Sequence, residues 1–223
     1  MSLAETLRRS VGPSLIVSTS RIEWPARISA TLRRALGQSA RIEFFFAYDD
    51  PYAAIALPGL INIARKHRVQ LSLYPLLQRG IADDPAADAR RLHAVEDSQR
   101  LARRSGKTLS RTQPLNAKDC AFLAAWTQSA RDDEGILNFA AAALEQLWFG
   151  SNGPIKQDDF RRLHGQFLHS AAGAGNEASL ARNTERLIQR GHWESPAVLA
   201  EGQWFLAHER LPQISDHLEH LGW

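Results

Sequence analysis

Two adjacent carboxylates are the first residues in this chain whose position could support chemistry. Asp49 and Asp50 directly follow an apolar run and stand before Pro51 and Tyr52. A carboxylate before a proline is typical of a helix N-cap, because it accepts backbone N–H groups while the proline fits the first helical position. The same carboxylate could act as a general base toward a bound substrate. Both interpretations of Asp50 stay open, although a helix N-terminus is expected to lower its pKa and so make it a poor base.

Thiol and metal chemistry have less support in the sequence. Cys120 is the single cysteine, so the chain has neither an internal disulfide nor a CxxC redox pair. The apolar residues around Cys120 favour a buried, inert thiol over a nucleophile. His164 and His169 are five residues apart, whereas residues on one helix face recur every three or four, so we expect no metal site.

Large aromatic side chains could line a cleft for an aromatic substrate. The candidates are Tyr52, Trp148 and Trp193, with Trp204 nearby in the sequence of the last predicted strand. Large aromatic residues at the ends of elements also pack in cores and between layers. Packing is the interpretation that the sequence favours.

A strand, a helix and a second strand position the carboxylates. Residues 42–47 form an aromatic and β-branched run typical of a buried strand. A helix is predicted from Pro51 to about Lys66, with a kink near Leu57 because Pro58 removes a backbone donor. Residues 69–74 alternate between apolar and polar side chains, which predicts the second strand.

Helices dominate the next part of the chain. Helical patterns cover residues 86–104, 117–130, 134–149, 157–171 and 176–190. Two short strands follow at 197–200 and 203–206, joined by a Glu-Gly turn, and an amphipathic helix covers 209–220. This order predicts an α/β thioredoxin-like fold with an all-helical domain inserted after the second strand. The peptide bond between Ser195 and Pro196 is expected to be cis, beside the site.

Composition excludes several classes of protein. The chain has 223 residues, 44% hydrophobic and 23% charged, which is typical of an ordinary globular protein. Basic residues outnumber acidic ones by only 27 to 24 and are scattered in pairs. We therefore expect no nucleic-acid partner. No apolar run reaches the roughly 18 residues of a membrane-spanning helix, and a signal peptide is not evident, so we expect a cytoplasmic protein without a membrane partner.

The domain organisation follows from these elements. Residues 41–75 and 192–223 are predicted to form the thioredoxin-like domain, and 76–191 the inserted helical domain. Residues 1–40 form an N-terminal extension with a short strand at 15–17 and a helix between Pro25 and Gly37. The extension could lengthen the sheet, pack on the helical domain or form an oligomer interface, and a homodimer is among the expected assemblies.

The motifs and their order resemble those of 2-hydroxychromene-2-carboxylate isomerases and kappa-class glutathione transferases, in the DsbA-like branch of the thioredoxin superfamily. The resemblance covers about residues 42–220. The motifs that carry it are Asp50-Pro51-Tyr52, Pro75-Leu76-Leu77 with Gly80, Trp148, Asn183-Thr184, Ser195-Pro196-Ala197 and Glu209-Arg210-Leu211. The resemblance implies glutathione as cofactor and a small aromatic or electrophilic substrate between the two domains.

Position by position, the implied site is altered. Asp50 stands where the family has the serine that supports the glutathione sulfur, and Ala47 stands where it has an acid. The resemblance implies that Asn116 lies near the glutathione sulfur and the substrate. It also implies that the backbone of Ser195, beside Pro196, can pair with an extended peptide such as glutathione.

The implied binding site for the γ-glutamyl end of glutathione is also altered. It lies at the start of the last helix, where Ala207 replaces a glycine, Glu209 keeps the acid and His208 lies beside the cleft.

Two functional hypotheses remain at this point. The first is a glutathione-dependent isomerase or transferase relative in which Asp50 is catalytic. The second is a catalytically decayed thioredoxin-like module that binds or interacts. The lack of a CxxC pair excludes ordinary disulfide exchange under either hypothesis.

Overall fold

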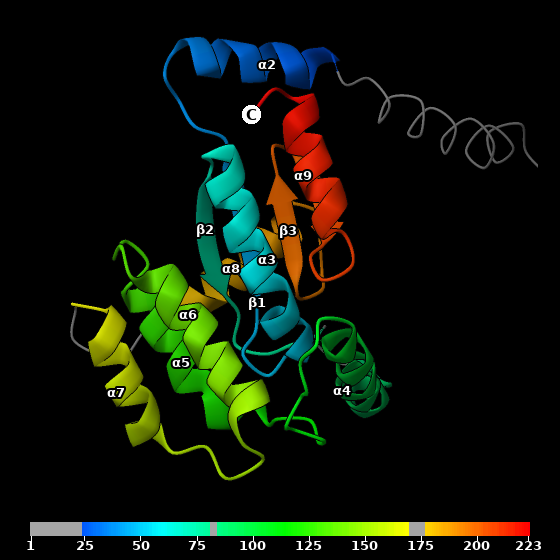
Figure 1. Ribbon diagram of the computed structural model, residues 1–223, viewed down its shortest axis with the longest axis vertical. Coiled ribbons are helices and arrows are strands. Elements are labelled where there is room, and N and C mark those ends of the chain that lie inside the picture. The colour runs from blue at the N-terminus through cyan, green and yellow to red at the C-terminus, as the bar shows by residue number, and fades with distance from the viewer. Residues whose placement is uncertain (1–23, 81–83, 170–176) are drawn as a thin grey trace, which may run out of the picture.

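The fold is seen in a computed structural model that describes residues 24–80, 84–169 and 177–223. A four-stranded sheet lies between helices (Figure 1). Its strands are β1 (Arg41–Phe46), β2 (Gln70–Pro75), β3 (Ala197–Ala200) and β4 (Gln203–Leu206). The order across the sheet is β2-β1-β3-β4, with β1 parallel to β2 and antiparallel to β3. The strands predicted at 42–47, 69–74, 197–200 and 203–206 are therefore confirmed within a residue or two.

Strand β1 is buried on both faces because each face meets a helical layer. Phe44 and Phe46 stack on each other within the main hydrophobic core. Phe45 points to the opposite face, where it stacks on Tyr74 and packs with Leu187. This two-sided burial explains why the strand reads as a continuous apolar run and not as an alternating one.

Helix α3 (Pro51–His67) begins where β1 ends and returns along the sheet (Figure 1). Asp50 is its N-cap, as predicted, and Arg68 ends it in the left-handed conformation. The helix continues through Pro58, which is exposed. Helix α9 (Leu211–His220) packs beside it, with the side chain of Leu211 directly against Gly59.

The helical segment enters between β2 and β3 in the chain, as expected for the predicted fold class. Its helices are α4 (Ala87–Arg104), α5 (Ala117–Ser129), α6 (Ile136–Glu145), α7 (Gln157–Phe167) and α8 (Glu177–Gln189). The predicted helix 134–149 is only partly α-helical, because residues 146–150 form a short π-helix, η1 (Gln146–Gly150). Residues of the insert such as Leu123 and Phe139 share one core cluster with Phe44 of the sheet.

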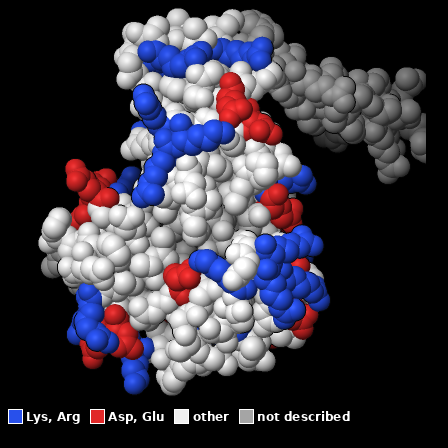
Figure 2. All heavy atoms as spheres, in the orientation of Figure 1, with Lys and Arg blue, Asp and Glu red and all other residues white. Residues whose placement is uncertain are grey.

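The N-terminal extension contributes α2 (Trp24–Ala35), which lies across the end of the molecule where β1 begins (Figure 1). Arginines hold it to the C-terminal segment. Arg27 bonds to His220 at 2.9 Å, Arg34 bonds to the Gly222 carbonyl, and both Arg33 and Arg34 lie over the Trp223 ring. Basic side chains accordingly line α2 in Figure 2. The strand predicted at 15–17 lies outside the described residues.

No helix in the described part of the chain is long and apolar enough to cross a membrane.

Gly135, at the start of α6, allows one close approach that a larger residue would block. A Cβ atom there would lie 1.8 Å from the backbone oxygen of Phe167. We expect Gly135→Ala to lower the free energy of unfolding by at least about 1–3 kcal/mol, because backbone must move to relieve the clash. Urea unfolding measures this loss.

The matched control is Gly165→Ala in α7, where a Cβ would meet nothing within 4 Å. Alanine is the better helix former by about 0.8–1 kcal/mol, so this variant should be slightly stabilised. An equal change in the free energy of unfolding in the two variants would contradict the close packing described around Gly135.

Candidate functional site

Asp50 is the N-cap of α3, at the edge of the sheet where β1 and β2 both end. Its side chain is 0% exposed. One carboxylate oxygen accepts the Tyr52 N–H at 3.1 Å, and the other accepts the Ser195 hydroxyl at 3.0 Å. The carboxylate is therefore fixed in orientation from two elements that are far apart in the sequence.

Ser195 joins Asp50 to the strand that precedes it. Its hydroxyl oxygen accepts the Ala47 N–H at 3.2 Å while donating to Asp50. The Ser195–Pro196 peptide bond is cis, as expected. Pro196 is held by its carbonyl, which accepts the Ala207 N–H at 3.0 Å. The contact that Ser195 makes here is through its side chain.

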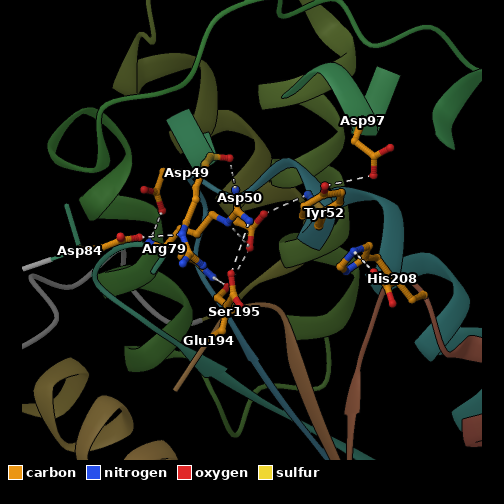
Figure 3. A network of polar contacts seen from close by, with 12 residues as sticks. Asp49, Asp50, Tyr52, Arg79, Asp84, Asp97, Glu194, Ser195 and His208 are labelled. Atoms are coloured by element: carbon orange, nitrogen blue, oxygen red, sulfur yellow. Dashed lines mark hydrogen bonds and ion pairs between the residues drawn. The ribbon is translucent and has the colours of Figure 1, made fainter. Parts of the chain in front are cut away.

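Arg79 supplies the positive charge of the site. Its Nε lies 3.5 Å from Asp50 Oδ2, and its Nη2 lies 3.7 Å from Glu194 Oε1. Its backbone N–H donates to Asp49 Oδ1 at 2.9 Å. Figure 3 shows Arg79 between the two aspartates, which therefore share one basic neighbour.

Burial dominates the electrostatics of both carboxyl groups. It raises the pKa of Asp50 to about 7. The positive charge of Arg79 lowers this pKa, but not enough to offset burial, and the nearby charge of Asp49 raises it further. Burial also raises the pKa of Asp49 to about 6. The expectation of a lowered Asp50 pKa is thus wrong, because loss of hydration outweighs the helix N-terminus. Asp50 can exchange a proton near neutral pH.

Tyr52 extends the network away from Asp50 (Figure 3). Its hydroxyl donates to Asp97 Oδ2 at 3.0 Å, and its ring stacks on His208 with centroids 3.8 Å apart. Arg79 also lies over this ring, at 5.2 Å. Burial raises the pKa of Tyr52 and lowers that of His208, so both groups are neutral at pH 7.

The resemblance also implies that Glu209 and Asn116 bind the cofactor, and Glu209 lies close to His208 of this network. Glu209 is exposed, with Oε1 3.7 Å from His208 Nε2. Asn116 is the N-cap of α5, where its side chain accepts the Lys118 N–H at 3.0 Å. Within the described residues, no hydrogen bond or ion pair joins Asn116 to Asp50.

The aromatic candidates are not brought together. Trp148 is 0% exposed, and its indole N–H donates to the Tyr48 carbonyl at 3.1 Å. Trp193 is 63% exposed and stacks on His192. Because one lies in the core and the other on the surface, Trp148 and Trp193 do not line one cleft with Tyr52.

Cys120 and His164 are both buried. Cys120 is 2% exposed, and burial raises the pKa of its thiol. His164 is buried between Trp126 and Phe139. No group of three or more potential metal ligands occurs among the residues that the structure describes.

Three site residues were not predicted from the sequence: Arg79, Asp97 and Glu194. A signal for Arg79 existed, since it follows the second strand and the carboxyl ends of parallel strands meet at one edge of a sheet. Asp97 lies inside α4 and reaches Tyr52 only through the packing of two helices. Nothing in its sequence neighbourhood distinguishes it.

The raised carboxyl pKa values predict how stability depends on pH. A carboxyl group whose pKa is raised in the folded state binds its proton more tightly there than in the unfolded state. Its stabilising contribution to the free energy of unfolding is therefore lost as the pH rises from about 4 to about 7. We expect the stability of Asp50→Asn relative to the natural chain to increase between pH 4.5 and pH 8. Urea unfolding at both pH values measures this change.

The control for pH is Asp88→Asn on α4, whose side chain is fully exposed. Its relative stability should not change between the two pH values. A parallel response of the two variants would show that Asp50 is not the buried titrating group.

Comparison with solved structures supports the fold at low sequence identity. A 2-hydroxychromene-2-carboxylate isomerase matches with a TM-score of 0.61 and 15% identity, over 81% of this chain and 95% of that one. A probable DsbA oxidoreductase from Streptomyces coelicolor matches with a TM-score of 0.62 and 13% identity, over 82% and 89%. No family model and no curated protein matches the sequence. The chain therefore has the DsbA-like thioredoxin fold with a helical insert, as predicted.

Proposed function

We propose that this chain is an acid–base isomerase built on the DsbA-like fold, acting on a small aromatic or electrophilic substrate. Asp50 moves the proton. The observation that carries the proposal is a fixed carboxyl group at the head of α3 with a pKa near 7. A general base is most effective when its pKa lies close to the working pH.

The contacts of Asp50 define how it would act. Ionised Asp50 accepts from Ser195 and from the Tyr52 N–H, and Arg79 balances its charge. These contacts hold the carboxylate in place before a proton arrives. Since Asp50 is not exposed, substrate must displace the Arg79 side chain to reach it.

A small pocket lies on the outer side of Arg79, lined also by Arg90, Asp84 and Glu194. We place there the approach of the polar or charged group of the substrate, because the lining is itself polar and charged.

Glutathione does not fit this site as a bound thiolate. The two donors at the head of α3, the Tyr52 N–H and the Ser195 hydroxyl, already donate to Asp50. Ionised Asp50 would repel a thiolate beside it. Protonated Asp50 would tolerate one but would no longer be a base. The proposed proton transfer therefore does not pass through a thiol.

We expect Asp50→Ser to bind glutathione better than the natural chain does. At about 4 Å and an effective dielectric constant near 20, the repulsion removed is on the order of 4 kcal/mol before screening. Serine caps a helix about as well as aspartate, so α3 should still form and the chain should still fold. Isothermal titration measures glutathione binding, and a melting curve shows whether the variant is folded.

Tight glutathione binding by the natural chain, with no gain in Asp50→Ser, would contradict this account of the site.

The function itself is tested by turnover without thiol. The assay uses 2-hydroxychromene-2-carboxylate, the compound in the name of the similar isomerase, and related hydroxy-aromatic acids. Each is tested with and without glutathione. Turnover that is independent of glutathione and lost in Asp50→Asn supports the proposal, and strict dependence on glutathione opposes it.

A second candidate function is a non-catalytic binding module. The observation that favours it is the complete burial of Asp50 behind Arg79. Absence of turnover for every aromatic acid, in a chain that still binds one of them, would favour this candidate.

A further inference from the structure

A large cavity lies at the end of the sheet opposite Asp50. It has a volume of about 810 Å³ and lies between α2, the beginnings of β1 and β2, and the β3–β4 turn. In Figure 1, α2 crosses this end of the sheet. Cavities of about 300–1,000 Å³ are typical of small-molecule sites. The roof comes from the N-terminal extension, so the cavity is separate from the proposed proton-transfer site.

Among the residues that the structure describes, the Arg41 guanidinium is the one in this cavity without an ion pair, although the Arg41 backbone N–H donates to Glu201 at 2.9 Å. Arg33 pairs with Glu201, and Arg190 pairs with Glu43 at 2.5 Å. Arg41 contacts the amide oxygen of Gln70 at 3.3 Å. Over the described residues, no carboxylate forms an ion pair with the Arg41 side chain. The lining therefore carries a surplus positive charge at Arg41.

The remaining lining is polar. Hydroxyl and amide side chains come from Ser29, Ser39, Gln38 and Gln70, and Leu199 is the single large apolar residue of the lining within the described part of the chain. Such groups donate to and accept from ligand hydroxyls. They offer little to an aromatic ring or an acyl chain, which would need apolar contact.

We propose that this cavity binds a small phosphate ester that carries several hydroxyl groups, with Arg41 contacting the phosphate. A guanidinium fork matches phosphate oxygens in a bidentate manner. The glutamines and serines contact the hydroxyl groups. Arg33 and Ser29 belong to α2, so the bound ester bridges the extension and the sheet.

The test is isothermal titration of the full chain at low salt with three probes: ribose 5-phosphate, inorganic phosphate and ribose. Ribose 5-phosphate is expected to bind at millimolar concentration or below. Inorganic phosphate should bind more weakly, and ribose should give no heat. Arg41→Gln should weaken ribose 5-phosphate binding at least tenfold.

Arg162→Gln is the matched control, because Arg162 lies on α7 with its side chain 81% exposed. It should bind ribose 5-phosphate as the natural chain does. Three results would overturn the proposal: no heat with ribose 5-phosphate, equal binding of ribose and its phosphate, or an equal loss in Arg41→Gln and Arg162→Gln. Ester and inorganic phosphate binding equally would overturn the role given to the hydroxyl contacts.

Discussion

Replacing Asp50 with asparagine is expected to lower turnover by about 10²–10⁴-fold, the usual contribution of a general acid or base. Asparagine keeps the shape of the side chain and is a good N-cap, so the first turn of α3 should survive. It cannot accept a proton at neutral pH. Steady-state kinetics on the thiol-free substrate measures the loss, and unfolding curves show whether the fold is kept.

The pH profile separates catalysis by Asp50 from a structural effect. Because burial raises the pKa of Asp50 to about 7, kcat/KM of the natural chain should rise with pH and level off above about 7. Asp49→Asn is the companion variant, since Asp49 is also buried but faces the Arg79 backbone. If turnover were lost in Asp49→Asn and kept in Asp50→Asn, the proton would be carried by Asp49, and the proposal for Asp50 would be wrong.

The elements around Asp50 could be predicted because their signals are local. The Asp50-Pro51 pair marks the start of α3 through backbone geometry that involves adjacent residues only. The aromatic run of β1 likewise reports burial on both sides of a strand. Local patterns of this kind are enough to give the order of strands and helices.

The electrostatics of the site could not be predicted in the same way. A helix N-terminus acts on Asp50 from its own segment, so it is visible in the sequence. The burial that outweighs it depends on tertiary packing, as do the opposing contacts of Ser195 and Arg79, which come from distant segments and lower the pKa of Asp50. The sign of the pKa shift therefore depends on tertiary packing.

Trp148 shows the same limit for aromatic residues. Its position at the end of a helix is compatible with a cleft wall or with core packing, and only burial distinguishes them. The structure places Trp148 in η1 at 0% exposure. Its indole N–H donates to Tyr48, two residues before Asp50.

We therefore expect Trp148→Ala to lower the free energy of unfolding by about 3–5 kcal/mol, because a large buried side chain is removed and a cavity remains. That loss is a large part of the total stability of a typical domain. Trp193→Ala, at 63% exposure, should change stability by no more than about 0.5 kcal/mol. Urea unfolding of both variants makes the comparison.

Trp148→Phe separates packing from the hydrogen bond. Phenylalanine keeps most of the apolar volume but leaves the Tyr48 carbonyl without its indole donor, which costs about 1–3 kcal/mol for a buried acceptor. The loss of free energy of unfolding in Trp148→Phe should therefore lie between the losses in Trp193→Ala and Trp148→Ala. If Trp148 instead lined a substrate cleft, Trp148→Ala would leave the unfolding curve nearly unchanged and raise KM, and that result would contradict the core position argued here.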